Sequence, residues 1–259
     1  MDIKSNLKQL RSEGITFIEN GYTQKECQLI KRKLDLIIDK FSKKKIIGAN
    51  KESQVIINPF RHDKDLTQLI LHKKVDQILN EVLDPDYVMI QCSMKNRKIR
   101  NDLPSLKTIN HGTTWHTDSR YLGNKKISSG FGYLVIGMFD EFSKNNSGTK
   151  YVPKSHLRTG VPERNKNYKY ETITGKPGTI AIMDSGIWHK AGDPTEASRW
   201  SMFSLYGGWF MKPYYRYWDM FTKIEKMNLS NKQKKILHFN SLPPKNEQER
   251  TSTLVRYPK

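Results

Sequence analysis

The stretch Gly178-Thr179-Ile180-Ala181-Ile182-Met183-Asp184 decides the fold that we predict for this chain. It is short and almost wholly apolar, and the turn signal Lys176-Pro177-Gly178 opens it, so we interpret it as a buried β-strand. Further β-prone or extended runs occupy residues 87–94, 113–119, 131–139, 150–153 and 199–210. Because Gly, Pro and Asn turns separate these runs, and helices do not alternate with them, the pattern predicts an all-β sandwich or barrel.

A strand and a helix are expected before this β region. Residues 14–18 form a short β-prone run. Thr23 and Glu26 then have the spacing of a capping box, in which the first residue caps a helix and the glutamate three positions later bonds back to it. Apolar residues follow at helical spacing, so we expect this helix to end at about Phe41.

The remaining segments complete the expected domain organisation. A second helix is predicted near Leu66–Leu83, and the polar stretch 43–65 before it is expected to be irregular. A short helix and a lysine-rich tail are expected after Pro213. We predict a single domain over residues 1–259, with a helical part at about 12–85, a β core at about 86–210 and a basic C-terminal extension at about 211–259.

Composition excludes several classes of protein. With 36% hydrophobic residues the chain can bury a core, and no apolar run approaches the roughly 18 residues that span a bilayer. The first residues show no secretory leader, and Cys27 and Cys92 are too far apart in sequence to indicate a disulfide framework or a zinc finger. We therefore expect no membrane span and a cytoplasmic location.

The net charge of +19 suggests an anionic partner. Lysines are spread along the chain and are denser at 43–45 and 232–235. No RNP motif or helix-turn-helix is present, so nucleic acid is disfavoured as the main partner, and a small molecule, for which an anionic group is one option, is preferred. The sequence leaves the oligomeric state open.

The motif Trp115-His116-Thr117-Asp118 is the first sign of a metal site. Residues two apart in an extended chain point to the same side, so the imidazole of His116 and the carboxylate of Asp118 can chelate one ion. Non-haem Fe(II) oxygenases need a second histidine to complete a facial triad, and His189, after the buried strand, supplies it. Taken alone, the His-x-Asp pair could equally be a surface turn or a hydrogen-bonded pair.

The other histidines have plainer interpretations. His111 could form a metal pair with His116 in a loop. His156 follows a turn and is expected to make structural hydrogen bonds, with a place in the pocket as the alternative. Surface or helix-face positions are expected for His62, His72 and His238.

Arg199 and Ser201 make the metal site more specific. They share one face of the last predicted strand, ten and twelve residues after His189. A guanidinium offers a fork of donors to a carboxylate, and the serine hydroxyl adds another donor. This is what anchoring the distal carboxylate of 2-oxoglutarate requires.

These residues resemble the phytanoyl-CoA dioxygenase family of Fe(II)/2-oxoglutarate-dependent oxygenases, over about residues 12–210. Besides the stretches already quoted, the likeness includes Asn146-Ser147-Gly148-Thr149 and Val152-Pro153-Lys154-Ser155-His156, in which Lys154 replaces the usual glycine. The resemblance implies a mainly β fold, a double-stranded β-helix (a distorted, cupin-like jelly roll) flanked by N-terminal helices. It implies Fe(II) at His116, Asp118 and His189, with 2-oxoglutarate and O2 as co-substrates.

The same resemblance extends the co-substrate site. It implies that Arg199 and Ser201 bind 2-oxoglutarate, and that the strand before the histidine motif adds contacts, for which Gln91 and Lys95 are the candidates. One branch of the family, the halogenases, lacks the carboxylate ligand. The presence of Asp118 therefore favours hydroxylation over chlorination.

The predicted activity is hydroxylation of an aliphatic carbon of a small-molecule metabolite, with release of succinate and CO2. Arg120 and Tyr121, just after Asp118, and Trp188, just before His189, are the candidate substrate contacts. Two alternatives stay open. The first is a metal-binding cupin-like protein that is not an oxygenase, either a relic site or a zinc or manganese enzyme. The second is an oxygenase that acts on nucleic acid.

Overall fold

The structure is a computed structural model of the 259-residue chain. It describes residues 2–41, 49–50, 55–97, 113–118, 121–122, 125–126, 131–193, 195, 197–239 and 248.

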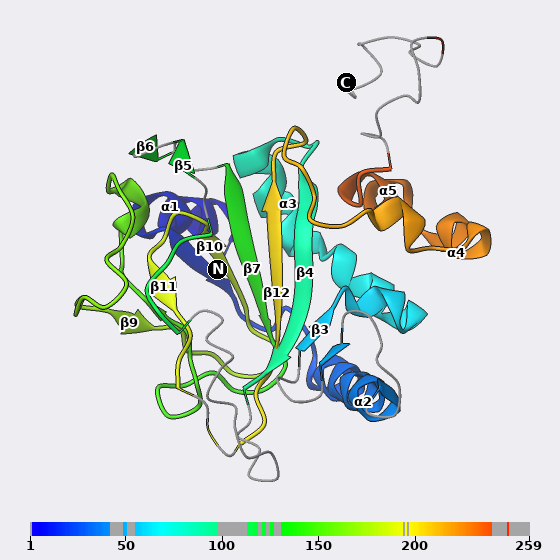
Figure 1. The fold of residues 1–259 in the computed structure, drawn as a ribbon, viewed down its shortest axis with the longest axis horizontal. Coiled ribbons are helices and arrows are strands. Elements are labelled where there is room, and N and C mark those ends of the chain that lie inside the picture. The colour runs from blue at the N-terminus through cyan, green and yellow to red at the C-terminus, as the bar shows by residue number, and fades with distance from the viewer. Residues whose placement is uncertain are drawn as a thin grey trace.

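A seven-stranded sheet forms the centre of the molecule, with the strand order β1-β10-β7-β12-β4-β3-β2 and every pair antiparallel (Figure 1). β12 lies between β7 and β4 and pairs with both along its length. The strands are β1 Ile15–Ile18, β10 Ile180–Asp184, β7 Gly132–Met138, β12 Trp200–Gly207, β4 Val88–Asn96, β3 Val55–Ile57 and β2 Ala49–Asn50.

A smaller sheet faces one side of the large one. It has the order β11-β8-β9, with β11 His189–Lys190, β8 Lys150–Tyr151 and β9 Glu171–Thr172. A bridge between His116 and His189 adds the histidine motif to this sheet, and β5 Tyr121–Leu122 pairs separately with β6 Lys125–Lys126. Two facing antiparallel sheets confirm the predicted jelly-roll class.

Helices cover the opposite side of the large sheet (Figure 1). The helices are α1 Ile3–Glu13, α2 Gln24–Phe41, α3 Lys73–Leu83, α4 Lys223–Asn228 and α5 Asn231–Ile236, with 3-10 turns η1 Pro59–Arg61, η2 Lys64–Ile70, η3 Ser155–Leu157 and η4 Tyr217–Asp219. The predicted capping box begins α2, because Thr23 Oγ1 accepts from Glu26 N at 3.2 Å and Thr23 N donates to Glu26 Oε2 at 2.7 Å. No helix in the described ranges is both long and apolar enough to cross a membrane.

The N-terminal part differs from the prediction in three ways. α1 was not predicted. The helix expected near Leu66–Leu83 is two elements, η2 and α3, because the chain is extended at Leu71 and His72, where His72 Nε2 lies 2.9 Å from the carbonyl oxygen of Gly21. Finally, β3 lies within the stretch expected to be irregular, and it pairs with β4.

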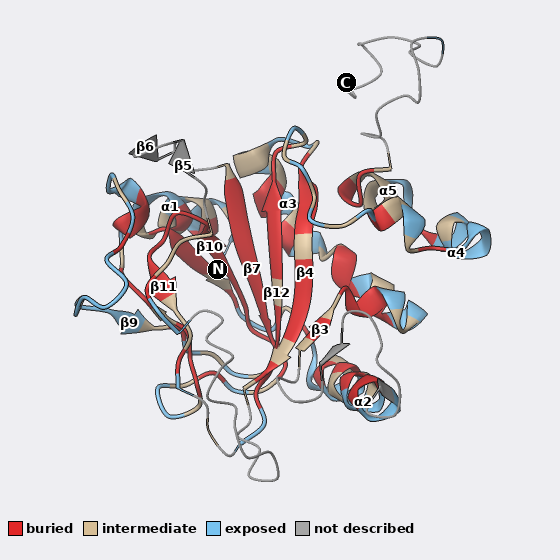
Figure 2. Cartoon of the chain, viewed as in Figure 1, coloured by how far each residue is buried: buried red, intermediate tan, exposed pale blue. Residues whose placement is uncertain are grey.

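Alternation along β12 divides the core into two layers. Trp200, Met202 and Tyr206 join the apolar cluster under the helices, whereas Leu205 belongs to the cluster inside the jelly roll. The large sheet is therefore buried on both faces, as Figure 2 shows. The segment after β12 contributes to the helix-side cluster, with Tyr217, Phe221, Ile236 and Leu237 all buried.

His238 gives the fold a dependence on pH. It was expected at the surface, yet it is 3% exposed, and its Nε2–H donates to the carbonyl of Met89 at 3.2 Å. Burial lowers the pKa of His238 to about 4. Since the unfolded chain has the higher pKa, about 6.5, it takes up the proton first as the pH falls. The contribution of neutral His238 to the free energy of unfolding is therefore complete above pH 6.5 and is lost as the pH falls towards 4.

We expect His238→Gln to remove this part of the pH dependence, because the amide can still donate to Met89 but does not titrate. Urea unfolding at pH 7 and pH 5 should show a loss of stability in the wild type that exceeds the loss in the variant, by at most about 3 kcal/mol. Equal losses in the two proteins would contradict the assignment.

Candidate metal centre

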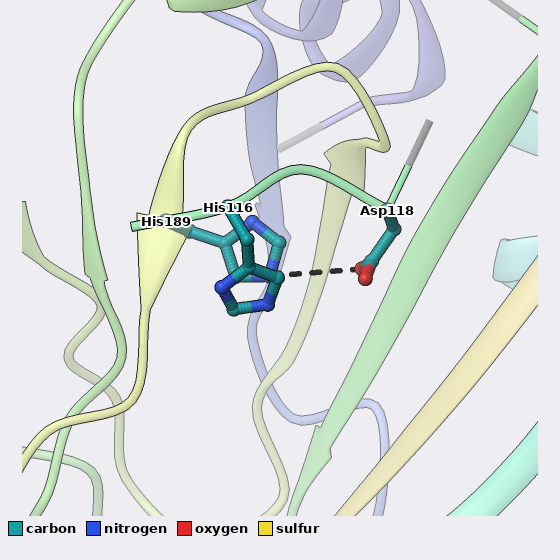
Figure 3. A group of neighbouring side chains, drawn as sticks. All are labelled: His116, Asp118 and His189. Atoms are coloured by element: carbon teal, nitrogen blue, oxygen red, sulfur yellow. Dashed lines mark ion pairs between the residues drawn. The ribbon is translucent and has the colours of Figure 1, made fainter. Parts of the chain in front are cut away.

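The structure brings His116, Asp118 and His189 together inside the jelly roll. One donor atom from each lies within 4.8 Å of the other two. The imidazole centroids are 4.2 Å apart, and His189 Nε2 lies 3.6 Å from Asp118 Oδ2. Figure 3 shows the two rings beside each other, with the carboxylate directed towards them. These donors could hold one transition-metal ion on one face, as two imidazoles and a carboxylate do in non-haem iron sites.

Backbone pairing holds the three residues in place. His116 N donates to the carbonyl of His189 at 3.0 Å, and His189 N donates to the carbonyl of His116 at 2.9 Å. Asp118 N donates to the carbonyl of Ser185 at 3.0 Å. Side chains directly opposite in an antiparallel pair lie on the same face, so this bridge places both imidazoles beside each other.

Hydrogen bonds orient both imidazole rings. Nδ1 of His116 lies 2.8 Å from the carbonyl oxygen of Thr114, and Nδ1 of His189 lies 2.9 Å from that of Ile187. A carbonyl oxygen can only accept, so Nδ1 carries the proton and Nε2 keeps its lone pair. Burial lowers the pKa of His189, although the charge of Asp118 opposes the shift, and this favours the neutral imidazole that a metal ligand needs.

Arg199 is a buried cation without an acidic partner. It is 1% exposed, its guanidinium lies 4.1 Å from the centre of the Phe142 ring, and Nη1 is 3.5 Å from Ser201 Oγ. Burial lowers its pKa to about 9. Within the described part of the chain, no carboxylate forms an ion pair with Arg199, and its Nε has no hydrogen-bond partner. Because burying an unpaired charge is costly, this geometry fits an anionic ligand.

β4 places two further predicted residues on the same inner face. Lys95 is opposite Ser201, and Gln91 is opposite Leu205. Burial lowers the pKa of Lys95, and the charge of Asp118 opposes this shift. Lys95 Nζ also lies 5.1 Å from the centre of the Phe203 ring.

Arg97, which directly follows β4, is a further charged residue that was not predicted from the sequence as a site candidate. It continues the alternation of Gln91 and Lys95, and its charge and that of Arg199 both contribute to lowering the pKa of Lys95. Its Nη2 donates to the carbonyl of Gly192 at 2.9 Å. Extending the period-two pattern by one more step would have found it.

Of the candidate substrate contacts, only Trp188 has its side chain in the described part of the chain. Trp188 packs against Trp115, Val152 and Tyr168, with the guanidinium of Arg158 5.3 Å from its ring centre, so its contacts are those of a packing residue. Arg120, the side chain of Tyr121 and His111 lie outside the described residues. His156 is 4% exposed, with Nε2 3.1 Å from the carbonyl oxygen of Arg11, as expected for a structural histidine.

A jelly roll that brings two histidines and a carboxylate together and also buries an arginine is typical of the class of Fe(II)/2-oxoglutarate-dependent oxygenases. The chain belongs to the phytanoyl-CoA dioxygenase (PhyH) family, whose model matches residues 10–200. It is therefore an enzyme of the Fe(II)/2-oxoglutarate type. Comparison with curated proteins gave no match.

Two solved structures share the fold. The non-haem α-ketoglutarate-dependent carbocyclase SnoK from nogalamycin biosynthesis is 15% identical, with a TM-score of 0.60 over 79% of this chain and 83% of that one. The non-haem α-ketoglutarate-dependent epimerase SnoN, from the same biosynthesis, is 12% identical, with a TM-score of 0.59 over 80% of this chain and 83% of that one. At these identities the likeness concerns the fold.

The uncompensated charge of Arg199 predicts a stability gain on its removal. We expect Arg199→Met to raise the melting temperature of the ligand-free protein by roughly 2–5 °C, because the thioether can still pack on Phe142 and the charge at this position is removed. Lys31→Met is the matched control, since Lys31 is paired with Asp140 at 2.5 Å and its loss should not stabilise the protein. Calorimetry that shows Arg199→Met to be clearly less stable would contradict this account.

Proposed function

We propose that this enzyme uses Fe(II), 2-oxoglutarate and O2 to hydroxylate an aliphatic carbon of a small-molecule metabolite, with release of succinate and CO2. The observation that carries the proposal is the combination of the His116, Asp118 and His189 cluster with the buried, unpaired guanidinium of Arg199. The three metal-binding side chains alone would fit many metalloproteins. The guanidinium of Arg199 supplies a second positive charge, in addition to that of the metal ion. Because it has no acidic partner, it fits a co-substrate that carries a carboxylate at each end.

The three cluster residues fit Fe(II). Imidazole nitrogen and carboxylate oxygen are the donors of the facial triad, and one carboxylate lowers the charge of the dication without filling its coordination sphere. Both histidines are fixed through Nδ1, so they would bind the ion through Nε2. We propose that His116, Asp118 and His189 are the protein ligands.

Arg199 and Ser201 would bind the distal carboxylate of 2-oxoglutarate. The guanidinium fork matches a carboxylate, and the charge-assisted bonds gain strength in a buried site. The charges of Asp118 and Arg199 both act on Lys95, so its ammonium would add positive charge to the co-substrate site. Gln91, on the same face, would contribute an amide to the same wall.

When bound, Fe(II) and 2-oxoglutarate supply the reduction of O2 that leaves succinate and CO2 and removes a hydrogen atom from the substrate. The chain contributes position and environment. The apolar layer inside the jelly roll, which includes Leu134, Ile136 and Leu205, would keep water away from the reaction. The enzyme would hold the target carbon close to the metal, so geometry would decide which bond reacts.

Hydroxylation is the outcome that we favour, because Asp118 occupies the position that halogenases leave open for halide. The two similar structures are named as a carbocyclase and an epimerase. Ring closure or epimerisation is therefore the alternative outcome for the same set of residues. Arg120 and Tyr121 remain our candidates for binding an anionic substrate group.

The other two alternatives have less support. A cupin-like metal protein without co-substrate has no use for the buried cation at Arg199. An oxygenase acting on nucleic acid would explain the net charge of +19, and its binding to single-stranded or duplex DNA and RNA would weaken steeply with salt. No binding at physiological salt would exclude it.

Mixing the protein with Fe(II) and 2-oxoglutarate without oxygen should give the weak visible charge-transfer absorption of the metal-bound 2-oxo acid. The band should be absent when succinate replaces 2-oxoglutarate, because succinate has no 2-oxo group. Folded, Fe(II)-loaded protein that shows no band would overturn the proposed cofactor chemistry.

Asp118→Ala should abolish succinate formation from 2-oxoglutarate in air, because the triad loses its only anionic ligand. Trp188→Phe is the control, since it changes a packing residue next to a proposed ligand and should retain succinate formation. Unchanged activity of Asp118→Ala in a coupled succinate assay would show that the ligand assignment is wrong.

A further inference from the structure

We propose that Asn96 and Asp140 are positioning residues for Arg199, and that they set the affinity and selectivity of the enzyme for 2-oxoglutarate. This inference rests on the proposed function. It concerns how a guanidinium with no acidic partner can be held in one place. The structure fixes the backbone on both sides of Arg199 instead of its side chain.

Asn96 holds the peptide of Arg199 itself. Its Oδ1 accepts from Arg199 N at 2.9 Å in a buried bond, and its Nδ2 donates to Ser198 Oγ at 3.2 Å. Asn96 is the last residue of β4 and is 7% exposed, directly opposite Trp200 in the sheet register. A single amide therefore bonds to the arginine and to the residue before it.

Asp140 holds the next peptide. Its Oδ2 accepts from Trp200 N at 2.8 Å and from Ser198 Oγ at 3.1 Å. Its Oδ1 accepts from Lys31 Nζ at 2.5 Å. The carboxylate is thus bonded to the backbone and to a lysine and forms no ion pair with the guanidinium of Arg199, although its charge partly opposes the lowering of the Arg199 pKa.

Helix α2 anchors this network from outside the sheet. Lys31 binds Asp140, and one turn later Asp35 Oδ1 accepts from Trp200 Nε1 at 2.8 Å. Main-chain bonds at residues 199 and 200 and side-chain bonds at 198 and 200 therefore fix the start of β12. They direct Arg199 inward while its fork of donors stays open for a ligand.

The network predicts a selective defect. In Asn96→Ala the Kd of the Fe(II)-loaded protein for 2-oxoglutarate, measured by anaerobic calorimetric titration, should rise about five- to tenfold, the effect of one hydrogen bond. The Kd for 2-oxobutanoate, which has no distal carboxylate to reach Arg199, should stay unchanged. The same change made in Arg199→Met should have no further effect on 2-oxoglutarate binding.

Matched variants separate positioning from general damage. Asn6→Ala removes an equally buried amide, which donates to Thr16 Oγ1 and the carbonyl of Phe17, and should lower stability without changing selectivity. Asp140→Ala should weaken 2-oxoglutarate binding, and Asp140→Asn, which keeps an acceptor for Trp200 N, should restore most of it. If Asn96→Ala does not fold, Ser198→Ala, at an exposed position, serves instead. It should raise the Kd for 2-oxoglutarate by a smaller factor and leave the Kd for 2-oxobutanoate unchanged.

Equal weakening of both 2-oxo acids, or a persistent effect in the Arg199→Met background, would overturn the positioning role and leave the proposed function intact. Wild-type protein that binds neither 2-oxo acid would overturn the proposed function and this inference with it.

Discussion

The backbone pair between His116 and His189 is the contact on which the site depends. Two hydrogen bonds of 2.9–3.0 Å join segments 73 residues apart and place both imidazoles on one face. The pair also makes the histidine motif an extra strand of the small sheet, beside β11. The same two bonds therefore attach the histidine motif to the small sheet and bring the two imidazoles of the candidate metal site together. Any change that separates these strands should affect the site and the small sheet together.

The second requirement of the site is electrostatic, because the protein must bury the cation of Arg199 at the start of β12. Arg199 lies just before β12, whose strand neighbours are β7 and β4, and its buried guanidinium packs on the ring of Phe142. A methionine there would suit folding better, since an unpaired buried charge destabilises the protein. The bonds from Asn96 and Asp140 to the adjacent backbone maintain this conformation. Such opposition between stability and binding is common at functional sites.

Much of the site could be predicted from the sequence because it follows from local geometry. Period-two alternation links His116 to Asp118 and Arg199 to Ser201, and the same rule extends from Lys95 to Arg97. The break at His72 could not be predicted, since it depends on a contact with Gly21, far away in the chain. α1 did have local signals, namely the Asp2 cap and Gly14 in the left-handed conformation at φ 81°. The contact of Asn96 with Arg199 joins residues 103 positions apart, so no local pattern reveals it.

The charges around the cluster bear on the substrate. Lys95, Arg97 and Arg199 influence one another electrostatically, whereas Asp118 is the carboxylate that faces Lys95. Asp140, near Arg199, is paired with Lys31, and Asp193, near Arg97, is paired with Lys150 and largely exposed. The charges of Fe(II) and the 2-oxoglutarate dianion would cancel, so that among the described residues these three cations would outnumber the one carboxylate of Asp118. We therefore propose that the substrate carries an anionic group, since this surplus of positive charge would attract such a group and would disfavour cationic metabolites.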